Sequence, residues 1–170
     1  EIKCDTLILS IGLIPENEIS KQINVELDSR TKGPVVDQNR ATTIRGVFSC
    51  GNVVHVHDVV DFVTLEGEIA GKSAAKYSSG KLKDGRKVSV TYDKNIRSIV
   101  PQKLNITEDT GDLDLYIRPM IMARDVVFNI YNGNDVILSK KQRIIRPAEM
   151  VKITLSAKDI AKITSNNIKV

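Results

Sequence analysis

The chain has 170 residues, of which 41% are hydrophobic, and it carries a formal net charge of +4. This length supports one domain or two small ones, and no apolar run approaches the ~18 residues that a membrane-spanning helix needs. The two cysteines, Cys4 and Cys50, are too far apart in sequence to form a C-x-x-C redox pair. With no signal peptide visible, we expect a cytoplasmic protein without a membrane partner.

The first 80 residues predict a strand, a second strand and a helix, in that order. Apolar runs predict strands at Thr6–Leu9 and Gly46–Cys50. Gly51 ends the second strand and permits a close backbone approach. A long helix is predicted from about Asp58 to Tyr77. Its apolar positions share one face: Val59, Phe62, Val63, Ile69 and Ala70.

The composition changes near residue 80. Residues 81–87 are polar, follow the helix and include a glycine, which predicts a linker. Residues 1–80 hold 8 Lys and Arg against 11 Asp and Glu, a net charge of −3, whereas residues 81–170 hold 17 against 10, a net charge of +7. We therefore expect two parts, residues 1–80 and residues 88–170, joined by the linker.

Residues 88–170 are typical of β structure. Strands are predicted at Val88–Tyr92, Leu113–Arg118, Val126–Tyr131, Val136–Ser139, Ile144–Ile145, Met150–Leu155 and Ile168–Val170. Asn132-Gly133-Asn134 predicts a tight hairpin, and Ser156 can cap a short helical turn. Short strands with no long helix between them predict an antiparallel sandwich of immunoglobulin or fibronectin type. The overall fold class is therefore expected to be α+β.

Three segments of the first part, in the same order, resemble motifs of the FAD-dependent pyridine-nucleotide oxidoreductases, the group of thioredoxin reductase. These segments are Cys4–Gly12 followed by Pro15 and Asn17, then Gly33–Asp37, and finally Thr42 with Gly46–Ser49 and Gly51-Asn52. The middle segment resembles the short hairpin that lies between the other two in that family, and the last segment resembles its second flavin-binding motif. The resemblance implies that residues 1–80 are the C-terminal segment of an FAD- and NAD(P)-binding domain, with FAD as cofactor and NAD(P) as a possible one.

The resemblance also implies which residues face the cofactor. They are Thr42, Gly51, Asn52 and the helix start Val60, Asp61 and Phe62. The family has an Asp where this chain has Asn52, and that Asp accepts a hydrogen bond from a ribityl hydroxyl of FAD. An amide oxygen can accept the same bond, more weakly because it carries no charge. Alternatively, Asn52 is only a turn residue at the end of a strand.

An FAD enzyme of this kind also needs a G-x-G-x-x-G turn to hold the pyrophosphate, and the chain contains none. We therefore expect a C-terminal fragment of an FAD-dependent oxidoreductase, inactive alone, whose first partner is the missing N-terminal FAD/NAD(P) region. The alternative is a non-catalytic interaction or assembly module derived from such an enzyme. Substrate and electron donor cannot be read from this chain.

The run His55-Val56-His57-Asp58 allows three interpretations. Two imidazoles beside a carboxylate could ligate a metal, but no third ligand is evident, so no metal site is predicted. The histidines could be turn residues near the helix start. Because the resembling segment runs beneath the flavin in the family, His55 and His57 are also candidate catalytic acid–base residues.

The basic second part could suggest nucleic-acid binding, with Lys140-Lys141-Gln142-Arg143 as the densest run. Aromatic residues that would stack on bases are scarce, and lysines on an edge strand give the same pattern. We therefore expect no nucleic-acid partner. Docking onto the acidic first part or onto a partner subunit is favoured by the opposite charges. A homodimer is possible as well, because residues 1–80 alone would leave sheet edges and an apolar face uncovered.

Overall fold

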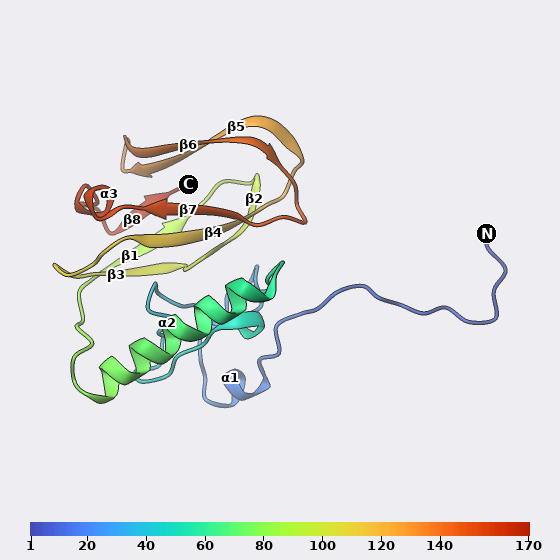
Figure 1. The fold of residues 1–170 in the computed structure, drawn as a ribbon, viewed down its shortest axis with the longest axis horizontal. Coiled ribbons are helices and arrows are strands. Elements are labelled where there is room, and N and C mark those ends of the chain that lie inside the picture. Colours follow the sequence, from blue (N-terminus) through green and yellow to red (C-terminus); the bar gives the residue numbers. More distant parts are fainter.

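The computed structural model describes all of residues 1–170 and places the first part beneath a β domain formed by the second part (Figure 1). The first part contains α1 (Glu18–Gln22), a single 3-10 turn η1 (Gly51–Val53) and the long helix α2 (Val60–Ser78). No helix is both long enough and apolar enough to cross a membrane.

The second part contains eight strands and a short helix. They are β1 (Arg86–Thr91), β2 (Ile96–Val100), β3 (Lys103–Ile106), β4 (Leu113–Pro119), β5 (Ala123–Asn132), β6 (Asp135–Ile145), β7 (Val151–Leu155), α3 (Ala157–Ala161) and β8 (Asn167–Lys169). The strands form a five-stranded sheet in the order β3-β1-β8-β5-β6 and a three-stranded sheet in the order β2-β4-β7. A cluster of 19 buried apolar residues, all from this part, fills the core with side chains of both sheets.

The α+β class and most of the predicted strands are confirmed. The pair β1–β8 is parallel, so the prediction of a wholly antiparallel arrangement is wrong, and the immunoglobulin or fibronectin type stays a prediction. Strands β2 and β3 were not predicted, because they flank Pro101 and neither has a strict alternation of buried and exposed residues. The segments predicted as Val136–Ser139 and Ile144–Ile145 are one continuous strand, β6. Arg86 and Lys87, expected in the linker, already belong to β1.

The two strands predicted in the first part are absent. Residues 1–14 are exposed throughout and extend away from the body (Figure 1), and the Gly46–Cys50 segment contributes one isolated bridge, between Ala41 and Phe48. The predicted hairpin is likewise reduced to a bridge between Leu27 and Pro34. A strand needs a neighbour for its backbone groups, and no other segment of this chain pairs with residues 6–9.

Backbone and amide hydrogen bonds attach the first part to the edge of the β domain. Gln38 and Asn105 exchange two bonds, at 2.7 and 2.8 Å, and Gln102 donates to and accepts from the backbone of Val36. Val36, Val54 and Val100 form a small buried cluster beneath these bonds. The segment that precedes α2 is therefore held against the second part.

Candidate functional site

The turn at Gly51 is built on two glycines that no other residue can replace without strain. Gly51 has φ +69°, and a Cβ there would lie 3.2 Å from Cγ1 of Val63. A Cβ on Gly33 would lie 1.9 Å from the carbonyl oxygen of Val54. The buried side chain of Asn17 donates to the carbonyls of Lys32 and Val53 and closes the same packing. The motif residues Gly33, Gly51 and Asn17 thus meet around one turn.

Asn52 is exposed on this turn, and its Oδ1 accepts the N–H of His57 at 3.1 Å. The interpretation of Asn52 as a turn residue therefore has direct support. Its Nδ2 has no protein partner, so the amide N–H₂ is free to donate to a ligand. A cofactor hydroxyl that approached Asn52 could accept a hydrogen bond from the free Nδ2. Oδ1 of Asn52 already accepts one hydrogen bond, from the N–H of His57.

Helix α2 starts a few residues later with an open N-terminus. Val59 is the N-cap in extended conformation, and no side chain accepts a hydrogen bond from the first turn. Val60 is 72% exposed, and Asp61 is exposed as well. Phe62 turns inward, with its ring 5.7 Å from that of Tyr116 on β4. The N–H groups of the first helical turn therefore face solvent with the positive end of the helix dipole.

Thr42 lies elsewhere. Its hydroxyl donates to the carbonyl of Val47 at 3.0 Å and accepts the N–H of Ile44 at 3.2 Å, so it stabilises its own turn. Thr42 lines a groove of about 570 Å³ between its turn and β1, whose lining includes none of the other proposed cofactor residues. The structure thus brings Gly51, Asn52 and the start of α2 together and leaves Thr42 apart.

Sequence reasoning missed the central residue of the site, Glu66. Its side chain is fully buried on the inner face of α2. Oε1 lies 2.9 Å from Arg40 Nη2 and 3.1 Å from His55 Nε2, whereas Oε2 accepts the N–H of Gly51 at 2.8 Å and lies 3.1 Å from His57 Nε2. The sequence did contain a signal for Glu66. Helical spacing places it on the same face as Phe62, Ile69 and Ala70, which is the predicted interior face, and a carboxylate is unusual there.

This cluster is electrostatically balanced. Burial by itself would raise the pKa of Glu66, but the hydrogen bond from His55, the closeness of His57 and the charge of Arg40 outweigh it and hold that pKa far below its usual range. Burial also lowers the pKa of His55, which the Glu66 carboxylate only partly opposes. One buried negative charge on Glu66 thus faces one buried positive charge on Arg40, with a neutral imidazole beside them.

Both histidines point into the protein. The side chain of His55 is 8% exposed and that of His57 is 1% exposed, and their rings pack edge to face at 4.2 Å. Both rings also lie within 6.3 Å of the Tyr116 ring. Neither ring nitrogen of His57 has a hydrogen-bond partner, because its 3.1 Å approach to Glu66 lacks hydrogen-bond geometry. The expectation that no third metal ligand lies near is wrong, since Glu66 supplies one.

The site is tied to the β domain at its outer end. Nη2 of Arg118, on β4, contacts Asp58 Oδ1 at 2.7 Å and the carbonyl of Val56 at 3.0 Å. The other oxygen of Asp58 accepts the N–H of Met150 at 2.6 Å. Asp58, which the sequence placed beside the histidines as a possible ligand, instead joins the two parts.

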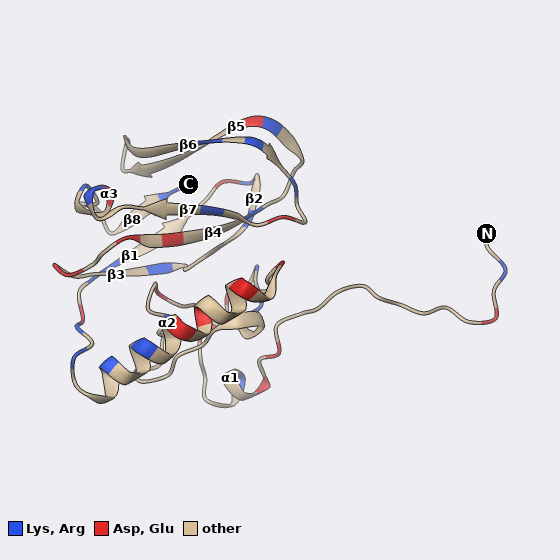
Figure 2. Ribbon diagram, viewed as in Figure 1, with Lys and Arg blue, Asp and Glu red and all other residues tan.

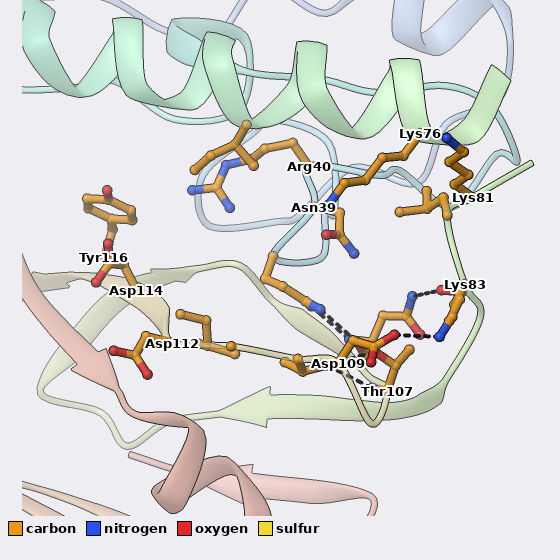
Figure 3. A pocket seen from close by; sticks show the side chains of 17 residues that line it. Asn39, Arg40, Lys76, Lys81, Lys83, Thr107, Asp109, Asp112, Asp114 and Tyr116 are labelled. Atoms are coloured by element: carbon orange, nitrogen blue, oxygen red, sulfur yellow. Dashed lines mark hydrogen bonds and ion pairs between the residues drawn. The ribbon is translucent and has the colours of Figure 1, made fainter. Parts of the chain in front are cut away.

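A cavity of about 430 Å³ opens next to the cluster, between α2 and the β domain (Figure 3). Lys76 and Lys81 lie on the helix side, whereas Asp112 and Asp114 lie on the β side (Figure 3). Arg40 and Tyr116 form part of its lining, so the cavity reaches the buried cluster through these two side chains.

Comparison with known proteins gives one family. Residues 1–67 match the model of the pyridine nucleotide-disulphide oxidoreductases, so this stretch is a region similar to that family, and the match points to an oxidoreductase family. It ends inside α2 and includes Gly51, Asn52, the two histidines and Glu66, but no residue of the β domain. No solved structure matches the chain.

Proposed function

We propose that the chain supplies the second flavin-binding motif of an FAD-dependent oxidoreductase, in contact with the ribityl chain and the flavin ring. The observation that carries this proposal is the open N-terminus of α2 beside the Gly51-Asn52 turn, within the stretch that matches the oxidoreductase family. Members of that family generally bind FAD and NAD(P), and we propose NAD(P) as the possible second cofactor.

The exposed groups fit this cofactor. The free Nδ2 of Asn52 can bond a ribityl hydroxyl, Gly51 allows close approach, and the unpaired N–H groups at Val60–Phe62 suit the carbonyl edge of a flavin. Bound FAD would supply the electron transfer, and the helix dipole would stabilise negative charge on its reduced ring. The hydroxyl of Thr42 already makes hydrogen bonds with the backbone of Val47 and Ile44. We therefore propose that Thr42 stabilises its own turn and does not contact the cofactor.

Residues 1–14 support a role inside a larger domain. Their large apolar side chains are 67–90% exposed: Ile2, Leu7, Ile8, Leu9, Ile11, Leu13 and Ile14. Such a run is typical of a strand that is buried on both faces of a parallel sheet. We propose that it pairs with an N-terminal FAD/NAD(P) region, which would also provide the pyrophosphate cradle. The chain alone would then be inactive, and its location in the cytoplasm stays a prediction.

The proposal is tested with Val60→Glu in the protein that contains the complete FAD domain. Val60 is largely exposed, so the change leaves packing intact but places a carboxylate where the flavin would become negative. We expect FAD affinity to fall about tenfold, which corresponds to ~1.4 kcal/mol of electrostatic repulsion. We also expect the flavin midpoint potential to become more negative.

Val136→Glu on β6 is the matched control, because Val136 is an exposed apolar residue of the β domain, 50% accessible. It should leave both quantities unchanged. Equal FAD affinity and potential in the two variants would show that the start of α2 does not face the flavin.

The alternative function is a non-catalytic interaction module. The exposed apolar segment before α1 favours it, because such a segment can add a strand to a partner subunit or to a second copy of the chain. Flavin absorbance of the purified, complete protein distinguishes the flavoenzyme from the interaction module. A stoichiometric flavin spectrum supports the enzyme, whereas a colourless protein that does not take up added FAD supports the module.

A further inference from the structure

We propose that His55, His57 and Glu66 form a binding site for one divalent transition-metal ion of the zinc class. The site lies in the interior behind the proposed flavin-facing turn and does not depend on the flavin.

The donor atoms already converge. One ring nitrogen of each histidine and one carboxylate oxygen of Glu66 all lie within 4.8 Å of one another, and all three residues are buried. Zinc bonds of about 2.0–2.2 Å in tetrahedral geometry separate neighbouring ligand atoms by roughly 3.2–3.6 Å. His55 Nε2 lies 3.1 Å from Oε1 of Glu66 and His57 Nε2 lies 3.1 Å from Oε2, so each imidazole is close to this spacing from one oxygen of the same carboxylate. Small movements of the side chains would therefore complete three ligand positions and leave a fourth open.

An independent observation points to a ligand at the same place. Nδ1 of His57 is buried without a partner, and Nε2 has only its 3.1 Å contact with Glu66 Oε2, which lacks hydrogen-bond geometry. Leaving a polar group unpaired inside a protein costs about 1–3 kcal/mol, so such groups need an explanation. A metal bound to Nε2 would satisfy one of the two nitrogens and would give the buried His57 ring a function.

The ligand types select the ion. Two imidazoles with one carboxylate suit zinc, nickel, copper or iron, whereas magnesium and calcium prefer oxygen-only sites. The histidines come from one short loop and the carboxylate from the facing helix, so an ion would join η1 and its following loop to α2.

Arg40 holds the site in its metal-free form. Its Nη2 is 2.9 Å from Glu66, whereas Nη1 reaches only the carbonyl of Asp37 at 3.5 Å and Nε has no partner. The ion pair is therefore the one short bond of this guanidinium. A divalent ion would repel Arg40, and the side chain would turn into the adjoining cavity that it already lines. Lysines and aspartates both line this cavity (Figure 3), and Asp114 is already paired with Lys152, so we infer only that the cavity has room for the displaced guanidinium. The cavity lining includes Arg40 but none of the three ligands, so movement of Arg40 would also open Glu66 to an ion that enters from the cavity.

The test titrates zinc alone into the untagged 170-residue chain and follows calorimetry together with the histidine ring signals by NMR. The chain has only two histidines, so each ring signal can be assigned to the site. We expect one ion per chain, shifts of both ring signals, and reversal by a chelator. His57→Ala should weaken binding at least about tenfold, whereas the matched control Val56→Ala, between the two histidines, should not.

Arg40→Met provides a second arm and should bind zinc more tightly than the wild type, because the competing charge is gone. Ring signals that do not move with zinc, or affinity unchanged in His57→Ala, would overturn the proposal. So would loss of binding in Cys4→Ser with the rings unaffected, which would locate the ion at the exposed thiol. If Arg40→Met does not fold, His57→Ala decides, provided that its circular dichroism and urea unfolding match the wild type, because the His57 ring packs against His55 and Tyr116.

Discussion

Glu66 determines the local structure around the site because both of its oxygens have partners from separate segments. It joins the N–H of Gly51, the guanidinium of Arg40 and the ring of His55 to one point of α2. A buried carboxylate is tolerated only when it is paired and hydrogen-bonded in this way. The exposed pair Lys72–Glu68, at a similar distance of 2.9 Å, contributes little by comparison, because water screens it.

The two cysteines should differ in reactivity. Cys4 is exposed, whereas Cys50 is partly covered, and burial raises the pKa of the Cys50 thiol, with a further rise from Glu66 that Arg40 partly offsets. Only the thiolate reacts, so Cys50 should be alkylated by iodoacetamide several-fold more slowly than Cys4 at pH 7.5. Its rate should rise about tenfold per pH unit up to pH 9. Mass spectrometry of the labelled peptides measures both rates, and a plateau for Cys50 below pH 8 would contradict the expectation.

At the scale of elements, the charges of α2 are ordered along its length. Asp61, Glu66 and Glu68 lie in its N-terminal half, and Lys72 and Lys76 in its C-terminal half (Figure 2). This order complements the helix dipole. The helix ends at Ser78, and Gly80 follows with φ +68°, as expected of a glycine past a helix end. The boundaries of α2 were thus predictable to within two residues, because they depend on local sequence.

The junction between α2 and β4 should depend on Arg118. Arg118→Met keeps the apolar stem but removes the bonds to Asp58, to the carbonyl of Val56 and to the carbonyl of Ala148. We expect a loss of about 1.5–3 kcal/mol in the free energy of unfolding, the range for hydrogen bonds to charged groups. Urea denaturation measures it. Arg97→Met, at an exposed position of β2, is the control and should stay within ~0.5 kcal/mol of the wild type.

At the scale of the whole molecule, the two parts are unequal. The 19-residue core lies entirely in the second part, whereas the first part contributes two valines to the small cluster with Val100. The first part is held by its contacts with the β domain and by the polar cluster around Glu66. Its structure therefore depends on the second part much more than the reverse.

Separating the parts should reveal this dependence. Residues 81–170 alone should unfold in one cooperative urea transition, because their core is complete. Residues 1–80 alone should give no such transition, since their apolar segment and the faces of Val36 and Val54 would be exposed. Circular dichroism follows both unfolding curves. A cooperative transition in residues 1–80, or its absence in residues 81–170, would contradict the expectation.

The sequence by itself determined the extent of α2, most strands of residues 88–170 and the likeness of residues 1–67 to an oxidoreductase family. These depend on local periodicity, turn residues and motif order. Only the tertiary structure decided that residues 6–9 form no strand in this chain and that β1 and β8 pair in parallel, because strand pairing depends on distant neighbours. It also decided that His55 and His57 turn inward onto Glu66, because burial and charge pairing bring together residues that are separated in sequence.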